Sequence, residues 1–182
     1  GGQQFYIPSH LRVLHVSSEP IFFHGTLRSN LIYGVPRDDH PDADRERVLR
    51  ICQMLRVQKE VLAVLYDENQ KMDWDDVFSQ TQQTLLSMAR AFIANAEVLC
   101  IHKPTLTFDA NTSASVLRLL RDFVDYKGIG QNPGNWHLRR PRTCIITVSR
   151  HETLEIVDQI YHVEPHRISK IPYELVGPDL LE

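Results

Sequence analysis

The sequence predicts an α/β fold, in which helices lie on both faces of a parallel sheet and a further helical segment is inserted in the chain. Short apolar runs such as Val98–Ile101 are typical of strands that are buried on both faces. Segments with helical spacing of apolar residues separate these runs, and strands that alternate with helices form parallel sheets. With 182 residues the chain is long enough to bury one substantial core.

The first part, residues 1–36, is expected to contain one strand and one short helix. Apolar residues predict the strand over 11–16, and the turn-forming run 17–20 ends it. Thr26 is a suitable N-cap for a helix over 27–33, because its side-chain oxygen can accept a hydrogen bond from a free N–H group of the first turn.

Residues 37–96 are predicted to be nearly all helical and to form the inserted segment. Apolar residues recur at helical spacing from Arg45 onward, and a short helix is expected over 59–65. The most regular helix begins after Ser79 or Thr81 and continues to about position 94. Its buried side is predicted to consist of Leu85, Leu86, Met88, Ala89 and Phe92.

The last part, residues 97–182, alternates between strands and helices. We expect a strand over 98–101, a helix over 112–124, a loop over 126–142, a second strand buried on both faces over 143–148, a short helix over 152–157 and a third strand over 159–163. All three strands are predicted to belong to one parallel sheet.

Composition narrows the function classes. A formal net charge of -3 disfavours a nucleic-acid partner, and no apolar run approaches the roughly 20 residues of a membrane-spanning helix. Three widely spaced cysteines indicate buried, reduced thiols in a cytosolic domain, and the histidine spacings indicate no metal site. Because the chain begins Gly1-Gly2-Gln3-Gln4, without Met or a leader, we expect it to be a piece of a longer protein.

Several segments occur in the order and at the intervals of one known family. Residues 78–92 are similar to a helix that begins LSGGQ and ends ARAL, and Val98-Leu99-Cys100-Ile101-His102-Lys103-Pro104-Thr105 resembles a Walker B strand. Residues 106–109 resemble a D-loop and residues 16–31 a Q-loop region. Residues 143–150 are similar to the strand that carries a switch histidine, and residues 177–181 to the family's closing segment. The chain thus resembles the nucleotide-binding domain of ABC transporters, and the Q-loop region favours the exporter-like subset.

This resemblance implies a P-loop NTPase-like fold. The parallel sheet would have helices on both faces and an inserted helical subdomain, and the N-terminal part of the fold would be missing. Residues 1–182 would then be a partial nucleotide-binding domain, with 37–96 as helical subdomain and with 1–36 and 97–182 as portions of a RecA-like core. The glycine-rich phosphate loop, GxxxxGK[ST], does not occur in the sequence.

The resemblance also marks individual site residues. Those that retain the family's residue type and are expected to bind nucleotide are Ser79, Gln82 and Asp109. Those that stand where the family has other functional residues are Ser18, His102, Lys103 and Ser149. At the Walker B positions, His102 replaces the aspartate that holds magnesium, and Lys103 replaces the glutamate that acts as general base. A charged ammonium cannot accept a proton, and magnesium prefers oxygen ligands, so these replacements disfavour ATP hydrolysis.

Purely structural roles also account for several of these residues. Ser79 suits a helix cap, Gln82 a solvent-facing helix position, Lys103 a solvated strand end and His102 a polar pocket. The basic run in 127–142 is more typical of a solvated loop than of a phosphate site.

We therefore predict a degenerate nucleotide-binding domain of an ABC exporter-like protein, impaired in hydrolysis and coupling ATP binding to transport. Alternatives are an active ATP-hydrolysing domain in the full-length protein and a non-functional fragment. The family uses ATP and magnesium, which these replacements disfavour for this chain alone. The implied partners are a transmembrane domain, facing Ile21, Phe22, Phe23 and residues 45–65, and a second nucleotide-binding domain. The implied location is the cytoplasmic face of a membrane, within a larger transporter.

Overall fold

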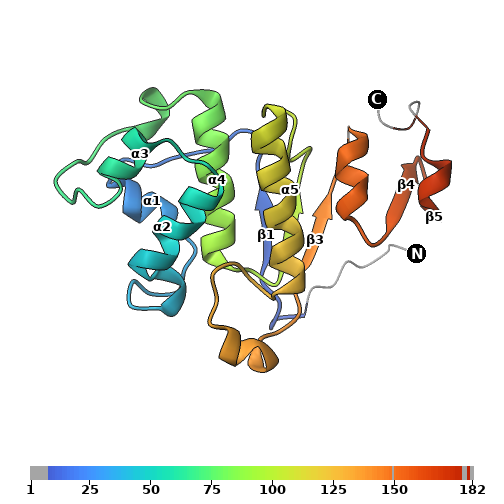
Figure 1. Cartoon of the computed structure of the whole chain (residues 1–182), viewed down its shortest axis with the longest axis horizontal. Coiled ribbons are helices and arrows are strands. Elements are labelled where there is room, and N and C mark those ends of the chain that lie inside the picture. Colours follow the sequence, from blue (N-terminus) through green and yellow to red (C-terminus); the bar gives the residue numbers. More distant parts are fainter. Residues whose placement is uncertain (1–7, 149, 178–179, 181–182) are drawn as a thin grey trace.

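The structure is a computed structural model, and it describes residues 8–148, 150–177 and 180. Three parts follow one another along the long axis of the molecule (Figure 1). Short helices form one end, a sheet with two long helices forms the middle, and a β-hairpin forms the other end.

The middle of the molecule is a three-stranded parallel sheet, so the predicted α/β fold is confirmed. Its strands are β1 (Val13–Val16), β2 (Val98–Ile101) and β3 (Thr143–Ile146), in the order β1-β2-β3. Ile101 of the central strand pairs with Val16 on one side and with Ile146 on the other. Since all three strands are parallel, their carboxyl ends meet at one edge of the sheet.

Helices α4 (Gln80–Ala94) and α5 (Ala110–Asp125) lie together against one face of this sheet (Figure 1). Leu99 and Ile101 point to that face and are buried. On the other face Ile145 is 57% exposed, so the prediction that residues 143–148 form a strand buried on both faces is wrong. The strand also ends earlier, at Ile146, and Thr143 is exposed. A continuous apolar run shows only that the segment is hydrophobic. It does not show whether other elements cover one face of the strand or both.

The hairpin corrects a second prediction, that residues 159–163 join the parallel sheet. Strand β4 (Ile160–Glu164) pairs with β5 (Arg167–Ile171) in an antiparallel two-stranded sheet instead. The turn between them contains His166 in a left-handed conformation, with φ of 68°. A two-residue turn returns the chain directly beside the preceding strand, and parallel pairing would have needed a longer crossover.

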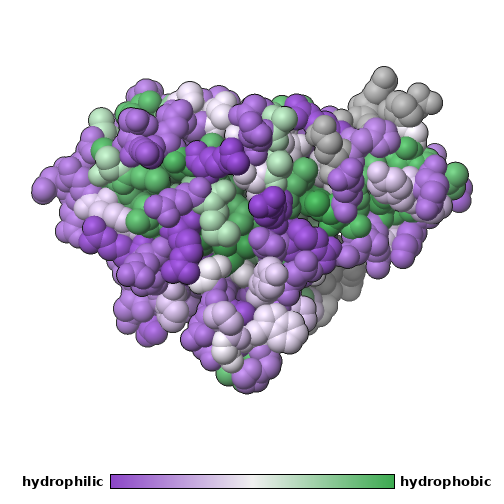
Figure 2. Space-filling model, in the orientation of Figure 1, coloured by the Kyte–Doolittle hydropathy of each residue, from purple (hydrophilic) through white to green (hydrophobic). Residues whose placement is uncertain are grey.

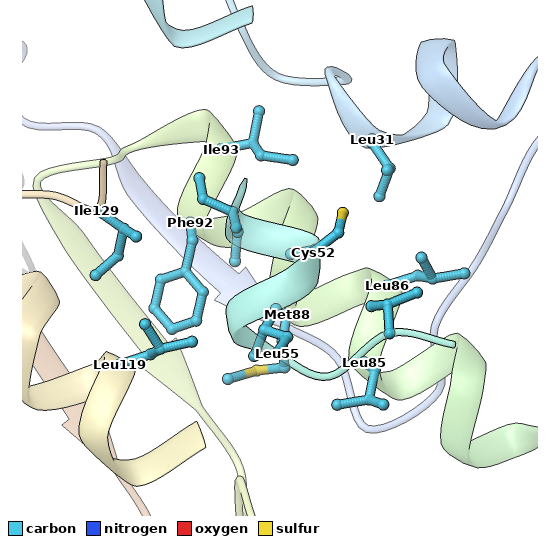
Figure 3. Close-up of a cluster of buried hydrophobic side chains, with 14 of the residues drawn as sticks. Leu31, Cys52, Leu55, Leu85, Leu86, Met88, Phe92, Ile93, Leu119 and Ile129 are labelled. Atoms are coloured by element: carbon cyan, nitrogen blue, oxygen red, sulfur yellow. The ribbon is translucent and has the colours of Figure 1, made fainter. Parts of the chain in front are cut away.

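The helical end contains α1 (Leu27–Leu31), α2 (Arg45–Met54) and α3 (Lys59–Val64). Its side chains share one hydrophobic core with α4 and α5, in which Leu31, Cys52, Leu86, Phe92 and Leu119 are buried (Figure 3). The predicted inward face of α4 is confirmed, because all five of its predicted residues are buried.

A buried arginine joins the helical end to the middle of the molecule. Arg47 of α2 is 4% exposed and donates hydrogen bonds to the backbone oxygens of Phe92 and Ile93 at the end of α4. It also donates to the backbone oxygens of Asp42 and Ile129, the latter in the loop after α5. One guanidinium therefore holds three segments that lie far apart in the sequence.

The surface in the view of Figure 2 is mainly hydrophilic, with apolar atoms reaching it near the middle and at the hairpin end. At the hairpin, Val163 and Ile168 are 68% and 70% exposed. None of the helices that the structure describes combines the length and the hydrophobicity needed to cross a membrane.

Candidate functional site

Ser79 is the N-cap of α4 and forms a capping box with Gln82. The Ser79 hydroxyl accepts a hydrogen bond from the Gln82 backbone N–H, and the Gln82 side-chain oxygen accepts one from the Ser79 backbone N–H at 2.9 Å. This reciprocal pair satisfies two backbone donors that a helix start leaves free. The capping role of Ser79 is thus present in the structure, and nucleotide binding by these two residues stays a prediction.

The first turn of α4 differs from the glycine-containing turn of the family signature. Gln80 and Thr81 occupy the positions of the two glycines, and both are exposed. The Gln82 side-chain amide donates to the side-chain oxygen of Gln58, just before α3, at 2.7 Å. Side chains at positions 80 and 81 reduce how closely a phosphate can approach the N–H groups of this turn.

Asp109 is the N-cap of α5, as Ser79 is of α4. Its carboxylate accepts hydrogen bonds from the backbone N–H and the hydroxyl of Thr112, both at 2.9 Å. The backbone bond and then the hydroxyl bond lower the pKa of Asp109, because both favour the ionised carboxylate. Asp109 is therefore a charged and exposed residue that caps the start of α5.

His102 and Lys103 lie at the carboxyl end of β2, beside the carboxyl end of β3. The Thr147 hydroxyl, just past β3, accepts a hydrogen bond from the Lys103 backbone N–H at 2.9 Å. The same oxygen lies 2.9 Å from His102 Nδ1. Lys103 has a positive φ of 42°, which is uncommon for a residue with a side chain. The Thr147 hydroxyl thus connects both Walker B replacements to the neighbouring strand.

These side chains do not fit a magnesium ion. Magnesium takes oxygen ligands in octahedral geometry, and at the two positions the chain offers an imidazole and an ammonium group. Among the residues that the structure describes, no three His, Cys, Asp or Glu side chains are grouped so that they could hold a metal ion. We therefore derive no catalytic step that passes through magnesium at this edge.

Among the described residues, no hydrogen bond or ion pair joins another predicted site residue to His102 or Lys103. Ser18 is exposed beyond the end of β1. Ser149 lies outside the described residues. Within the described ranges, no hydrogen bond or ion pair joins Ser79 or Gln82 to Asp109 or to the end of β2.

Two residues at this edge were missed by the sequence analysis. Thr147 was assigned to a strand, and only its register beside His102 reveals the contact. Arg150 donates to the backbone oxygen of Leu106 at 3.4 Å, which places it against the loop after β2. In the sequence, Arg150 is marked only by being a basic residue close after a predicted strand.

The predicted contact segment near the Q-loop region is partly exposed. Phe22 is buried, with the Arg90 guanidinium 4.7 Å from its ring centroid, whereas Phe23 is 40% exposed. Ile21 is 75% exposed, and its backbone oxygen accepts a hydrogen bond from Arg90. Next to them, Tyr33 packs edge-on against Phe23, and a groove of about 320 Å³ opens between β1 and α4.

The groove and this exposed segment form a continuous surface. Residues of both, Ile21 and Tyr33 among them, line the groove together with Arg90 of α4. Exposed aromatic and aliphatic side chains thus lie beside this groove.

Comparison with known proteins shows which proteins the chain is similar to. No protein-family model matches it. It is 33% identical over 104 residues to ABC transporter ecdL of Aspergillus rugulosus, covering 57% of this chain and 6% of that protein. It is 27% identical over 161 residues to ABC multidrug transporter MDR2 of Trichophyton interdigitale, covering 88% of this chain and 11% of that protein. The chain thus spans only a small part of these relatives.

A solved structure shares the fold. It is the dimeric structure of a post-hydrolysis state of the ATP-binding cassette MJ0796 bound to ADP and Pi, with a TM-score of 0.60 and 18% identity. The match covers 87% of this chain and 62% of that one. The transporter relatives agree with the resemblance derived from the motifs, and the solved structure shows that the chain shares the fold of an ATP-binding cassette.

Proposed function

We propose that this chain is a degenerate nucleotide-binding domain of an ABC exporter-like transporter, which couples ATP binding to transport without hydrolysing ATP efficiently itself. The observation that carries the proposal is the replacement of the Walker B pair by His102 and Lys103, at the carboxyl end of the central strand. The formal charge at this pair changes from about -2 in the family to about +1, and such a pair repels a divalent ion.

Further support comes from the first turn of α4 and from the Lys103 backbone. The capping box uses polar groups of Ser79 and Gln82 within the helix. The backbone N–H of Lys103 donates a hydrogen bond to the Thr147 hydroxyl. The Lys103 ammonium cannot serve as a general base while it is charged.

Phosphate release tests the proposal for hydrolysis. We expect the purified chain to release no phosphate from ATP above the rate without protein, with or without magnesium. The parent transporter is then assayed with Lys103→Ala, which should leave its ATPase rate unchanged. Magnesium-dependent turnover that Lys103→Ala abolishes would instead support an active ATP-hydrolysing domain.

For coupling, we propose that the surface formed by Ile21, Phe23 and Tyr33 contacts a transmembrane domain, at the cytoplasmic face of the membrane. Ser79, Gln82 and Asp109 would face a second nucleotide-binding domain with its bound ATP. In support, Phe23 and Ile21 are exposed, while neighbouring Phe22 is anchored in the core.

Transport by the parent protein tests this role. Phe23→Ser should impair transport at unchanged expression, because it removes an exposed contact and little core packing. Phe22→Ser should lower expression itself, because that ring is buried, and it thus reports the effect of misfolding. Lys103→Ala should change transport little; a silent Phe23→Ser beside a damaging Lys103→Ala would refute the coupling role.

A further inference from the structure

Strand β1 is an edge strand of the parallel sheet and pairs with a neighbour, β2, on one side only. The carbonyl oxygen of Arg12, just before β1, accepts a hydrogen bond from the first residue of β2 at 3.1 Å. In a parallel pair, successive residues of a strand direct their backbone groups alternately to one side and to the other. Val13 and His15 therefore direct their N–H and C=O groups to the open side of β1, away from β2.

This open side is accessible. Val13 is 43% exposed and His15 is exposed as well. Among the residues that the structure describes, none forms a hydrogen bond with the backbone groups of these two residues. An edge with free N–H and C=O groups pairs readily with another extended segment, and proteins therefore usually cover such edges or place charges on them.

The groove of about 320 Å³ between β1 and α4 follows this open edge. Consecutive residues 12–17 line it, so it runs along the side of the strand and not over one of its faces. On the α4 side the lining residues are small, namely Ser87, Ala91 and Ala94. Small and mainly apolar side chains leave room for the side chains of a segment that lies beside β1.

One charged side chain in the groove has donors that are not used. The Arg90 Nη1 donates to the backbone oxygen of Ile21 at 2.9 Å, whereas its Nε and Nη2 are buried and have no hydrogen-bond partner among the described residues. The charge of Asp75 opposes the lowering of the Arg90 pKa by burial, yet no ion pair joins the two side chains. A guanidinium with two unused donors favours a carboxylate as its partner.

We propose that an extended, mainly apolar segment of the parent transporter adds a strand to the open edge of β1, and that a carboxylate of this segment pairs with Arg90. Its backbone would pair with Val13 and His15, and its side chains on one face would enter the groove, as in other cases of strand addition. Since this chain covers only 11% of the MDR2 relative, the rest of such a transporter supplies many segments that could do so. The inference rests on the proposed function, and it adds main-chain pairing at β1 to the side-chain contacts proposed for Phe23 and its neighbours.

Amide hydrogen exchange in the purified chain and in the parent transporter tests this inference. In the purified chain the amides of Val13 and His15 should exchange fast, because no group accepts a hydrogen bond from them. In the parent transporter both should exchange about tenfold more slowly or slower still, the effect of one backbone hydrogen bond. The Leu14 amide, which faces β2, serves as the reference and should be protected in both proteins. Equal exchange of Val13 and His15 in the two proteins overturns the inference, and so does protection that grows with the concentration of the purified chain, because it assigns the edge to a second copy.

Substitutions at the edge separate main-chain pairing from side-chain contact. His15→Pro removes the outward N–H and no hydrogen bond to β2, so an edge strand should accept it. In the parent transporter it should impair transport and return the Val13 amide to fast exchange, whereas the matched control His15→Ala, which keeps the N–H, should do neither. Arg90→Gln should also reduce the protection, because it removes the partner of the carboxylate.

Equal effects of His15→Pro and His15→Ala overturn the proposed strand addition. If His15→Pro lowers expression, the exchange of the unsubstituted proteins still decides the question. Failure of the inference leaves the proposed function standing, because that function is tested separately by phosphate release and by the Phe23→Ser variant.

Discussion

Removing the Arg47 guanidinium should detach the helical end of the molecule from the sheet and its long helices. The side chain is 4% exposed and donates to four backbone oxygens, those of Phe92, Ile93, Ile129 and Asp42. Burial lowers the pKa of Arg47, and the neighbouring Asp42 charge opposes this effect. Arg47→Ala would leave these oxygens without their donor and the buried Asp42 carboxylate without its cation.

The expected loss follows from this geometry. Removing one partner of a buried ion pair costs about 3–5 kcal/mol, because the other charge stays buried and uncompensated. Asp42 keeps hydrogen bonds from Asn95 and Gln131, which places the estimate near the lower value. Since whole domains are stable by about 5–15 kcal/mol, the substitution removes a large part of the free energy of unfolding.

Urea unfolding followed by circular dichroism measures this loss. The control is Arg50→Ala, an exposed arginine of the same helix, for which a change within about 0.5 kcal/mol is expected. Arg47→Lys keeps the charge and loses the fork of donors, so it should cost an intermediate amount, and it decides the question if Arg47→Ala does not fold. Equal unfolding free energies for the Arg47 and Arg50 variants would refute the reasoning.

Three further predictions concern local features. Ser79→Ala should lower the free energy of unfolding by about 1 kcal/mol in urea, because it removes the cap of α4; no change would mean that the cap is not formed. The pKa of Glu97 is lowered overall: burial raises it, and hydrogen bonds from Arg12 outweigh that effect. The contribution of Glu97 to the free energy of unfolding is therefore present above its unfolded pKa and is lost as pH falls through its folded pKa. Glu97→Gln should therefore reduce the loss of stability on acidification, measured by unfolding at several pH values. An unchanged dependence of the unfolding free energy on pH would contradict this. Burial raises the pKa of Cys52 and Cys144 to about 12, so both thiols should react with a disulfide reagent at pH 8 only after urea unfolding, and fast reaction of the folded chain would refute it.

Local sequence indicated two of the helix starts, with Thr26 as a cap and Ser79 as one of two possible caps, whereas α5 begins at Ala110, before the predicted start at 112. Thr26, Ser79 and Asp109 each cap a helix through a hydrogen bond to a backbone N–H only three residues away. The caps thus depend on residues adjacent in the chain, which the sequence displays directly. The parallel sheet and the inward face of α4 were predictable for a related reason, since hydrophobic periodicity reports the surface that an element must bury.

Contacts between distant segments decided the rest. Thr147 meets His102 across 45 positions, and Arg47 reaches Ile129 across 82, so neither contact leaves a local pattern. The exposure of Ile145 and the pairing of β4 with β5 depend on which strands and helices lie alongside. Sequence by itself thus indicated most of the elements, two of their caps and the resemblance to ABC nucleotide-binding domains. The tertiary structure alone decided which side chains surround the end of β2, because that arrangement requires two separate strands to be placed side by side.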